Sequence, residues 1–194
     1  MDPTPQSSPS PPSIASRWTT KFVATVDAGT ERMGGLLPWL LLILVLVGAF
    51  NALARYGGKS IGIDLSSNLY IELQWYLFSA VFLLGGAYTL KKGAHVRVDV
   101  VSSRLSAQTR FWIERLGLWL LLIPYCIFMI YISWTPVAES IALTEQSPDP
   151  GGLPRYYVKA FIPLGFLILL LQGLAEGLRP RAVADLCQGE VGDE

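Results

Sequence analysis

Four long apolar runs follow one another along the chain, separated by short polar stretches. They occupy residues 36–56, 70–90, 111–134 and 157–178, and hydrophobic residues make up 52% of the sequence. At about 1.5 Å of rise per residue, a helix over each run would cross the hydrocarbon layer of a bilayer, which is about 30 Å thick. The pattern predicts an all-α integral membrane protein with four transmembrane helices.

Polar segments frame this membrane domain, which we place at residues 17–178. Residues 1–16 are rich in proline and serine, a composition that cannot bury apolar surface and predicts disorder. Residues 179–194 form a polar tail, and residues 135–156 form a loop with a dense turn signal between the third and fourth spans.

Three finer features of the helices also follow from the pattern. Apolar positions at helical spacing predict a short amphipathic helix over 17–35, ahead of the first span. The run of Gly57, Gly58 and Lys59 is expected to end the first span. Pro124 is expected to kink the third span, because proline lacks the backbone N–H that a helix interior needs.

The distribution of basic residues predicts the orientation. An even number of spans puts both termini on one side of the membrane. Eleven basic residues fall on that side and four on the other, and the richer side is cytoplasmic by the positive-inside rule. The eleven are Arg17, Lys21, Arg32, Lys91, Lys92, Arg97, Arg104, Arg110, Arg115, Arg179 and Arg181, and the four are Arg55, Lys59, Arg155 and Lys159.

Composition narrows the chemistry that the chain can perform. It has one histidine and two cysteines, so paired histidine ligands for haem and a histidine-rich zinc site are excluded. Neither a glycine-rich phosphate loop nor a nucleophile elbow is present, which argues against an enzyme and predicts no cofactor in this chain. The basic residues flank membrane spans, which argues against nucleic-acid binding.

The main polar interruption, at residues 91–99, contains the only histidine. His95 and Asp99 are four residues apart and would share a helix face, as a metal or proton-relay pair or as a hydrogen-bonded hinge. We favour the hinge, because a lone histidine and one acid make a poor metal site. Apolar positions from Val98 to Leu105 at spacings of three and four predict an amphipathic interfacial helix between the second and third spans, with Arg97 at anionic headgroups. A short strand is the alternative.

Two further sets of residues are candidates for structural or interface contacts. Arg55 and Glu72 lie near the outer ends of the first two spans, as a buried pair, as a contact to another subunit, or each reaching water independently. Gly85 and Gly86, like Gly165, are expected to permit close helix approach, which drives packing in lipid.

The run Gly-Ala-His95-Val-Arg97-Val-Asp99, after a helix that contains Glu72 and the Gly85-Gly86 pair, resembles the signature of the small membrane subunit of tripartite ATP-independent periplasmic (TRAP) transporters. The resemblance covers residues 36–178. The loop at 147–154, with Lys159, Pro163 and Gln172, resembles the branch associated with 2-oxo acids and related organic carboxylates.

This resemblance implies a multi-pass protein of the bacterial inner membrane that works in a complex of three parts. In that family a periplasmic solute-binding protein captures an organic acid, and a large membrane subunit carries it across by an elevator-like motion driven by a sodium gradient. The small subunit is a scaffold, so this chain would hold neither the substrate nor the sodium site.

Two other function classes remain as alternatives. A membrane-anchor subunit of a respiratory or other enzyme complex commonly needs haem or quinone ligands, for which one interfacial histidine is a poor basis. A self-sufficient carrier usually has broken helices or intramembrane charge at mid-depth, and the four spans show neither.

Overall fold

The computed structural model describes residues 14–62, 67–93 and 106–179, and these segments contain helices and no strand. Four helical stretches are long and apolar enough to cross a membrane, as the sequence predicts: Arg17–Gly58, Asn68–Lys91, Phe111–Ala142 and Arg155–Leu178. The helices are α1 (Ile14–Ile61), α2 (Asn68–Lys91), α4 (Ala107–Gly117), the π-helical turn η1 (Leu118–Leu122), α5 (Ile123–Ala142) and α6 (Arg155–Leu178).

Helix α1 is longer than the sequence pattern predicts. The helix expected at 17–35 and the span expected at 36–56 form one unbroken helix, which runs to Ile61, past the glycines expected to end it. A glycine inside a helix costs about 1 kcal/mol, whereas a break in apolar surroundings costs several kcal/mol for each unsatisfied backbone group. The helix begins at Ile14, inside the segment 1–16 expected to be disordered; the rest of that segment lies outside the described residues.

The third span is also part of a longer helix, which ends at Ala142 and leaves a shorter loop than the sequence predicts. Just before Pro124 the winding changes, and the N–H of Ile123 donates to the carbonyl of Leu118, five residues back. Proline cannot donate to the carbonyl four residues before it, and the wider π turn accommodates this gap. The distortion expected at Pro124 therefore takes the form of a π turn.

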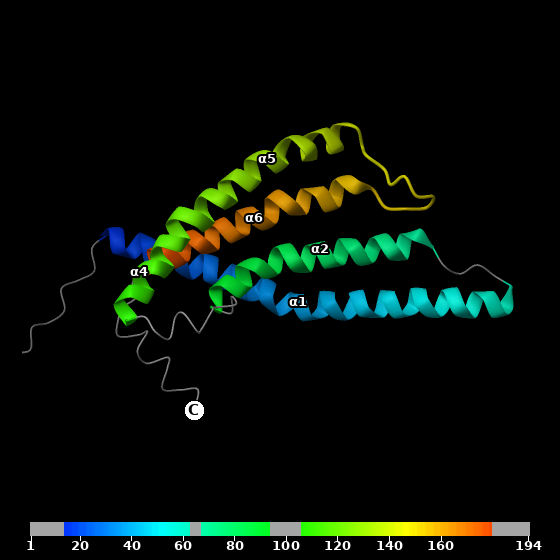
Figure 1. Cartoon of the computed structure of the whole chain (residues 1–194), viewed down its shortest axis with the longest axis horizontal. Coiled ribbons are helices and arrows are strands. Elements are labelled where there is room, and N and C mark those ends of the chain that lie inside the picture. Colours follow the sequence, from blue (N-terminus) through cyan, green and yellow to red (C-terminus); the bar gives the residue numbers. More distant parts are fainter. Residues whose placement is uncertain (1–13, 63–66, 94–105, 180–194) are drawn as a thin grey trace, which may run out of the picture.

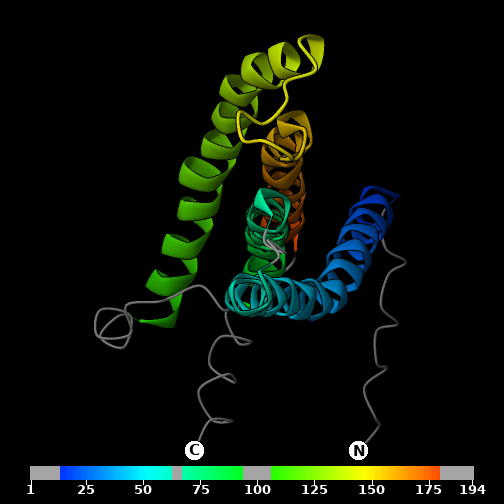
Figure 2. The same ribbon diagram turned by 90° about the vertical axis from the view of Figure 1, so that its right-hand side faces the viewer.

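Helix α6 lies in the middle of the bundle, with α5 on one side and α1 and α2 on the other (Figures 1 and 2). The buried positions carry small side chains, including Ala80, Ala87 and Ala175. Large apolar side chains point outward instead, and Tyr131 on α5 is 80% exposed. Small residues between helices and large apolar ones outside are the arrangement expected where lipid, and not water, surrounds a bundle.

The bundle has two ends that we name by what lies there (Figure 1). The start of α1, the end of α2, the start of α4 and the end of α6 form the termini end. The loop 143–154, the end of α1 and the start of α2 form the hairpin end. The interfacial helix predicted after Asp99 falls almost entirely outside the described residues, which resume at Ser106.

Candidate functional site

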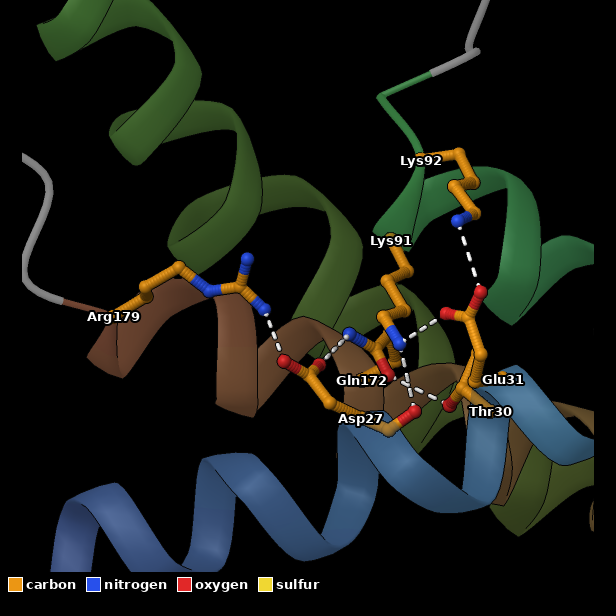
Figure 3. A network of polar contacts seen from close by, with 7 residues as sticks. All are labelled: Asp27, Thr30, Glu31, Lys91, Lys92, Gln172 and Arg179. Atoms are coloured by element: carbon orange, nitrogen blue, oxygen red, sulfur yellow. Dashed lines mark hydrogen bonds and ion pairs between the residues drawn. The ribbon is translucent and has the colours of Figure 1, made fainter. Parts of the chain in front are cut away.

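A network of polar side chains joins three helices at the termini end (Figure 3). We call it the termini-end network; it consists of Asp27, Thr30, Glu31, Lys91, Lys92, Gln172 and Arg179. The members from α1, Asp27, Thr30 and Glu31, are at most four residues apart. They therefore lie on neighbouring faces of the helix, which point to α2 and α6. The other members come from the end of α2 and the last turns of α6.

The centre of this network is the carboxylate of Asp27. One of its oxygens accepts a hydrogen bond from Gln172 Nε2 at 3.0 Å, and the other pairs with Arg179 Nη2 at 2.6 Å. Gln172 Oε1 in turn accepts from Thr30 Oγ1 at 2.7 Å. Gln172 and Thr30 are fully buried, so both ends of the glutamine amide depend on α1 for their hydrogen bonds.

Two lysines at the end of α2 complete the network. The ammonium of Lys91 donates to the backbone carbonyl of Asp27 at 2.8 Å and also pairs with Glu31. Lys92 Nζ lies 2.9 Å from the other oxygen of Glu31, and this hydrogen bond and charge raise the pKa of Lys92. Glu31 is therefore the acid that pairs with both lysines.

Helix α4 is attached to the same end through a separate contact. The guanidinium of Arg115 donates to the backbone carbonyl of Gly177 and, at 3.3 Å, to that of Arg179. These carbonyls belong to the last turn of α6, which has no following turn to supply donors, and a cation is favourable there. Arg179 itself lies 3.5 Å from Glu176, one turn earlier in α6.

A second network, the hairpin-end network, fixes the loop 143–154 against α2. Glu72, which is 5% exposed, accepts hydrogen bonds from Ser147 Oγ and from the backbone N–H of Leu153. Tyr76 donates from its hydroxyl to the carbonyls of Leu153 and Pro154, at 3.2 and 3.0 Å. The loop is therefore held by two side chains one turn apart on α2.

Glu145 ties the same loop to α5 and α6. It forms an ion pair with Lys159 of α6 and accepts a hydrogen bond from Ser140 of α5 at 2.6 Å. Two hydrogen bonds lower the pKa of Glu145: the one from Lys159 has the larger effect, and the one from Ser140 the smaller. Both ends of the bundle thus carry polar contacts that cross between helices.

The structure separates the two charges that the sequence suggested as a pair. Glu72 is buried and turned to the loop before α6, whereas Arg55 is exposed on α1. Within the described residues, the two side chains form no ion pair with each other. The sequence missed the loop as the partner because Ser147 and Leu153 lie 75 and 81 residues beyond Glu72.

The glycines also differ from expectation in what they contact. A Cβ atom on Gly85 would lie 3.7 Å from Leu37, an ordinary contact, and one on Gly86 would meet nothing within 4 Å. The close approach of α2 and α6 occurs at Gly165, where a Cβ would lie 2.7 Å from that of Leu83. The glycine pair therefore makes no tight helix contact within the described chain, while the prediction for Gly165 agrees with the structure.

The remaining sequence candidates, His95, Arg97 and Asp99, lie outside the described residues, and their roles stay predictions. Within the part of the chain that is described, no three His, Cys, Asp or Glu side chains gather in a group that could hold a metal ion. The chemistry that the networks provide is attachment: each links helices that are far apart in the sequence.

Four apolar helices with interhelical polar contacts at both ends define a multi-pass membrane protein. Residues 44–182 match the family of tripartite ATP-independent periplasmic transporters, DctQ component. Because the match covers most of the chain, the protein belongs to this family and is the small membrane subunit of a TRAP transporter, a transport component and not an enzyme. No curated protein and no solved structure gives a significant match.

In TRAP systems this family works together with a large membrane subunit and a periplasmic binding protein. The match confirms the family to which the run around His95 and the four-span order pointed. The narrower resemblance of the loop at 147–154 to the 2-oxo acid branch stays a prediction.

Proposed function

We propose that this chain is a scaffold for the large membrane subunit during sodium-coupled, binding-protein-dependent uptake of an organic carboxylate in the bacterial inner membrane. A 2-oxo acid is the substrate class that the loop at 147–154 favours. In this proposal the substrate and sodium sites belong to the large subunit, and the binding protein selects the carboxylate.

One observation carries the scaffold role: the middle of every span is free of charge. Residues 33–54, 73–90, 116–138 and 160–175 contain no Asp, Glu, Lys, Arg or His. A path for a carboxylate or a sodium ion needs charge or coordinating oxygen near mid-depth, usually at a broken helix. The charges of this chain lie toward the helix ends, where many of them hold helices together.

We also propose that the termini end faces the cytoplasm. Eleven of the fifteen basic residues belong to that side of the chain, which is the bias that orients membrane proteins. Cys187, in the polar tail, and Asp149, exposed in the loop 143–154, provide a test with a membrane-impermeant maleimide on intact cells. Labelling of an Asp149→Cys variant but not of Cys187 supports this orientation, and the reverse pattern contradicts it.

The experiment that tests the scaffold role uses proteoliposomes with an imposed sodium gradient and a labelled 2-oxo acid loaded on its binding protein. Vesicles with both membrane subunits should take up substrate, and the affinity-tagged small subunit should retain the large one in mild detergent. Vesicles with this chain alone should not transport. Uptake by this chain alone, or loss of the large subunit on purification, would overturn the proposal.

A further inference from the structure

In the first part of α1, the acidic side chains form ion pairs with basic residues of α2 and α6, whereas the basic side chains are exposed. Asp27 and Glu31 point to α2 and α6, where they pair with Arg179, Lys91 and Lys92 (Figure 3). A second set, Arg17, Lys21 and Arg32, is exposed, and within the described residues none of the three forms an ion pair. Because both acids are paired with basic residues of α2 and α6, the outward side of this segment carries a net positive charge.

The three outward bases share one face of the helix. At 3.6 residues per turn, Arg17, Lys21 and Arg32 fall within an arc of roughly 60°. Thr30, which is 1% exposed, lies on the opposite side of the helix. We call the outward set the basic face; it is a stripe along α1 and not a scatter of surface charges.

The level of this face along the bundle follows from the network. Asp27 contacts Lys91 and Arg179, so it lies where α2 and α6 end. Lys21 lies six residues before Asp27 in the chain and Arg32 five residues after it, about 9 Å and 8 Å along the helix. Both distances are close to the Debye length of roughly 8 Å at physiological ionic strength. Lys21 and Arg32 can therefore both interact with a charge that lies at the level where α2 and α6 end.

Two features direct this face to the lipid around the bundle. The view along the bundle shows that the first turns of α1 lean outward, away from the line of the rest of the helix and to the side of α6 (Figure 2). Trp18, beside Arg17, is 71% exposed. Tryptophan next to basic residues on a helix is the combination found at the membrane interface.

We propose that the basic face, Arg17, Lys21 and Arg32 with Trp18 at its edge, binds the headgroups of anionic phospholipids. The bases contact the lipid phosphates, and the termini-end network holds α1 at the tilt that presents them. Each base near an anionic surface strengthens binding by about fivefold. The inference requires that the bundle spans a bilayer, and it does not depend on the transported substrate or on which side of the membrane the face lies.

Native mass spectrometry of the full-length protein in detergent, titrated with phosphatidylglycerol or with phosphatidylcholine, tests the proposal. The wild type should prefer phosphatidylglycerol, and an R17Q/K21Q/R32Q variant should lose that preference. Lys21→Gln alone should weaken phosphatidylglycerol binding by about fivefold. Arg55→Gln, which removes an exposed arginine from the hairpin end, is the matched control and should change it little.

A triple variant that binds phosphatidylglycerol as the wild type does, or an Arg55→Gln change as large as that of Lys21→Gln, overturns the proposal. A second measurement needs no variant. Raising the ionic strength from about 0.05 M to about 0.5 M should reduce the wild-type preference, because salt screens exposed charges. A preference for phosphatidylglycerol that salt leaves unchanged also contradicts the proposal.

Discussion

Replacement of Asp27 by alanine should destabilise the bundle. The buried amide of Gln172 would lose the acceptor for its Nε2, and Arg179 would lose its ion pair with Asp27. An unsatisfied buried amide costs about 1–3 kcal/mol, and an ion pair whose side chains are about a quarter exposed adds up to about 1 kcal/mol. The sum is about 1–4 kcal/mol.

Asparagine at the same position separates these two contributions. Its carbonyl can still accept from Gln172, so Asp27→Asn should lose only the ion pair, at about 1 kcal/mol or less. Thermal unfolding of the detergent-solubilised full-length protein, followed by circular dichroism, should show a fall in Tm of about 2–16 °C for alanine and a smaller fall, of at most about 4 °C, for asparagine. Glu31→Gln, at a half-exposed position, serves as the control and should shift Tm less than Asp27→Ala.

The reasoning would be refuted by equal shifts for the alanine and asparagine variants, because the buried amide would then contribute nothing. A shift for Glu31→Gln as large as that for Asp27→Ala would refute it as well. In that case the exposed lysine contacts, and not the buried hydrogen bonds to Gln172, would hold α1 to the other helices.

The remaining predictions concern the hairpin end and the helix contacts. The pKa of Glu145 is lowered in the folded protein, so this residue stabilises the fold above its unfolded pKa and loses that contribution as the pH falls through its folded pKa. Between pH 6 and about pH 3, Tm should therefore fall less for Glu145→Gln than for the wild type. Gly165→Ala should destabilise by about 1–3 kcal/mol in the same melting assay, whereas Gly86→Ala, at an open position, should be neutral or stabilising by up to about 1 kcal/mol. Glu72→Ala removes the acceptor that holds the loop before α6 and should make limited proteolysis within it faster; unchanged cleavage would show that Tyr76 suffices.

The sequence was sufficient for the number and order of the spans, because apolar runs long enough to cross a bilayer have few other interpretations. It failed on local boundaries. Gly57 and Gly58 suggested a helix end, and the structure continues to Ile61, since the preference of a glycine is small beside the cost of exposing backbone in apolar surroundings.

The networks could not be predicted from the sequence, because their members are distant along the chain. Asp27 meets Gln172 across 145 residues, and Glu72 meets Leu153 across 81. A signal was nonetheless present: Gln172 is the only polar side chain in residues 160–175, and Asp27 and Thr30 share the inward side of α1. A lone polar residue in a span needs a partner inside the bundle, though spacing alone does not say which one.

The long reach of the Asp27 contacts has a consequence for the order in which the protein is made. Gln172 and Arg179 belong to α6, so the side chain of Asp27 lacks these two partners until α6 has been synthesised. At about 5–20 residues per second, the 145 residues between Asp27 and Gln172 correspond to about 7–30 s. During that interval, the side of α1 that will face α6 lacks its polar partners, and the arrival of α6 supplies them. A ribosome that stalls before α6 is made would therefore leave the carboxylate of Asp27 without these partners, exposed to any quality-control factor that recognises polar groups in lipid.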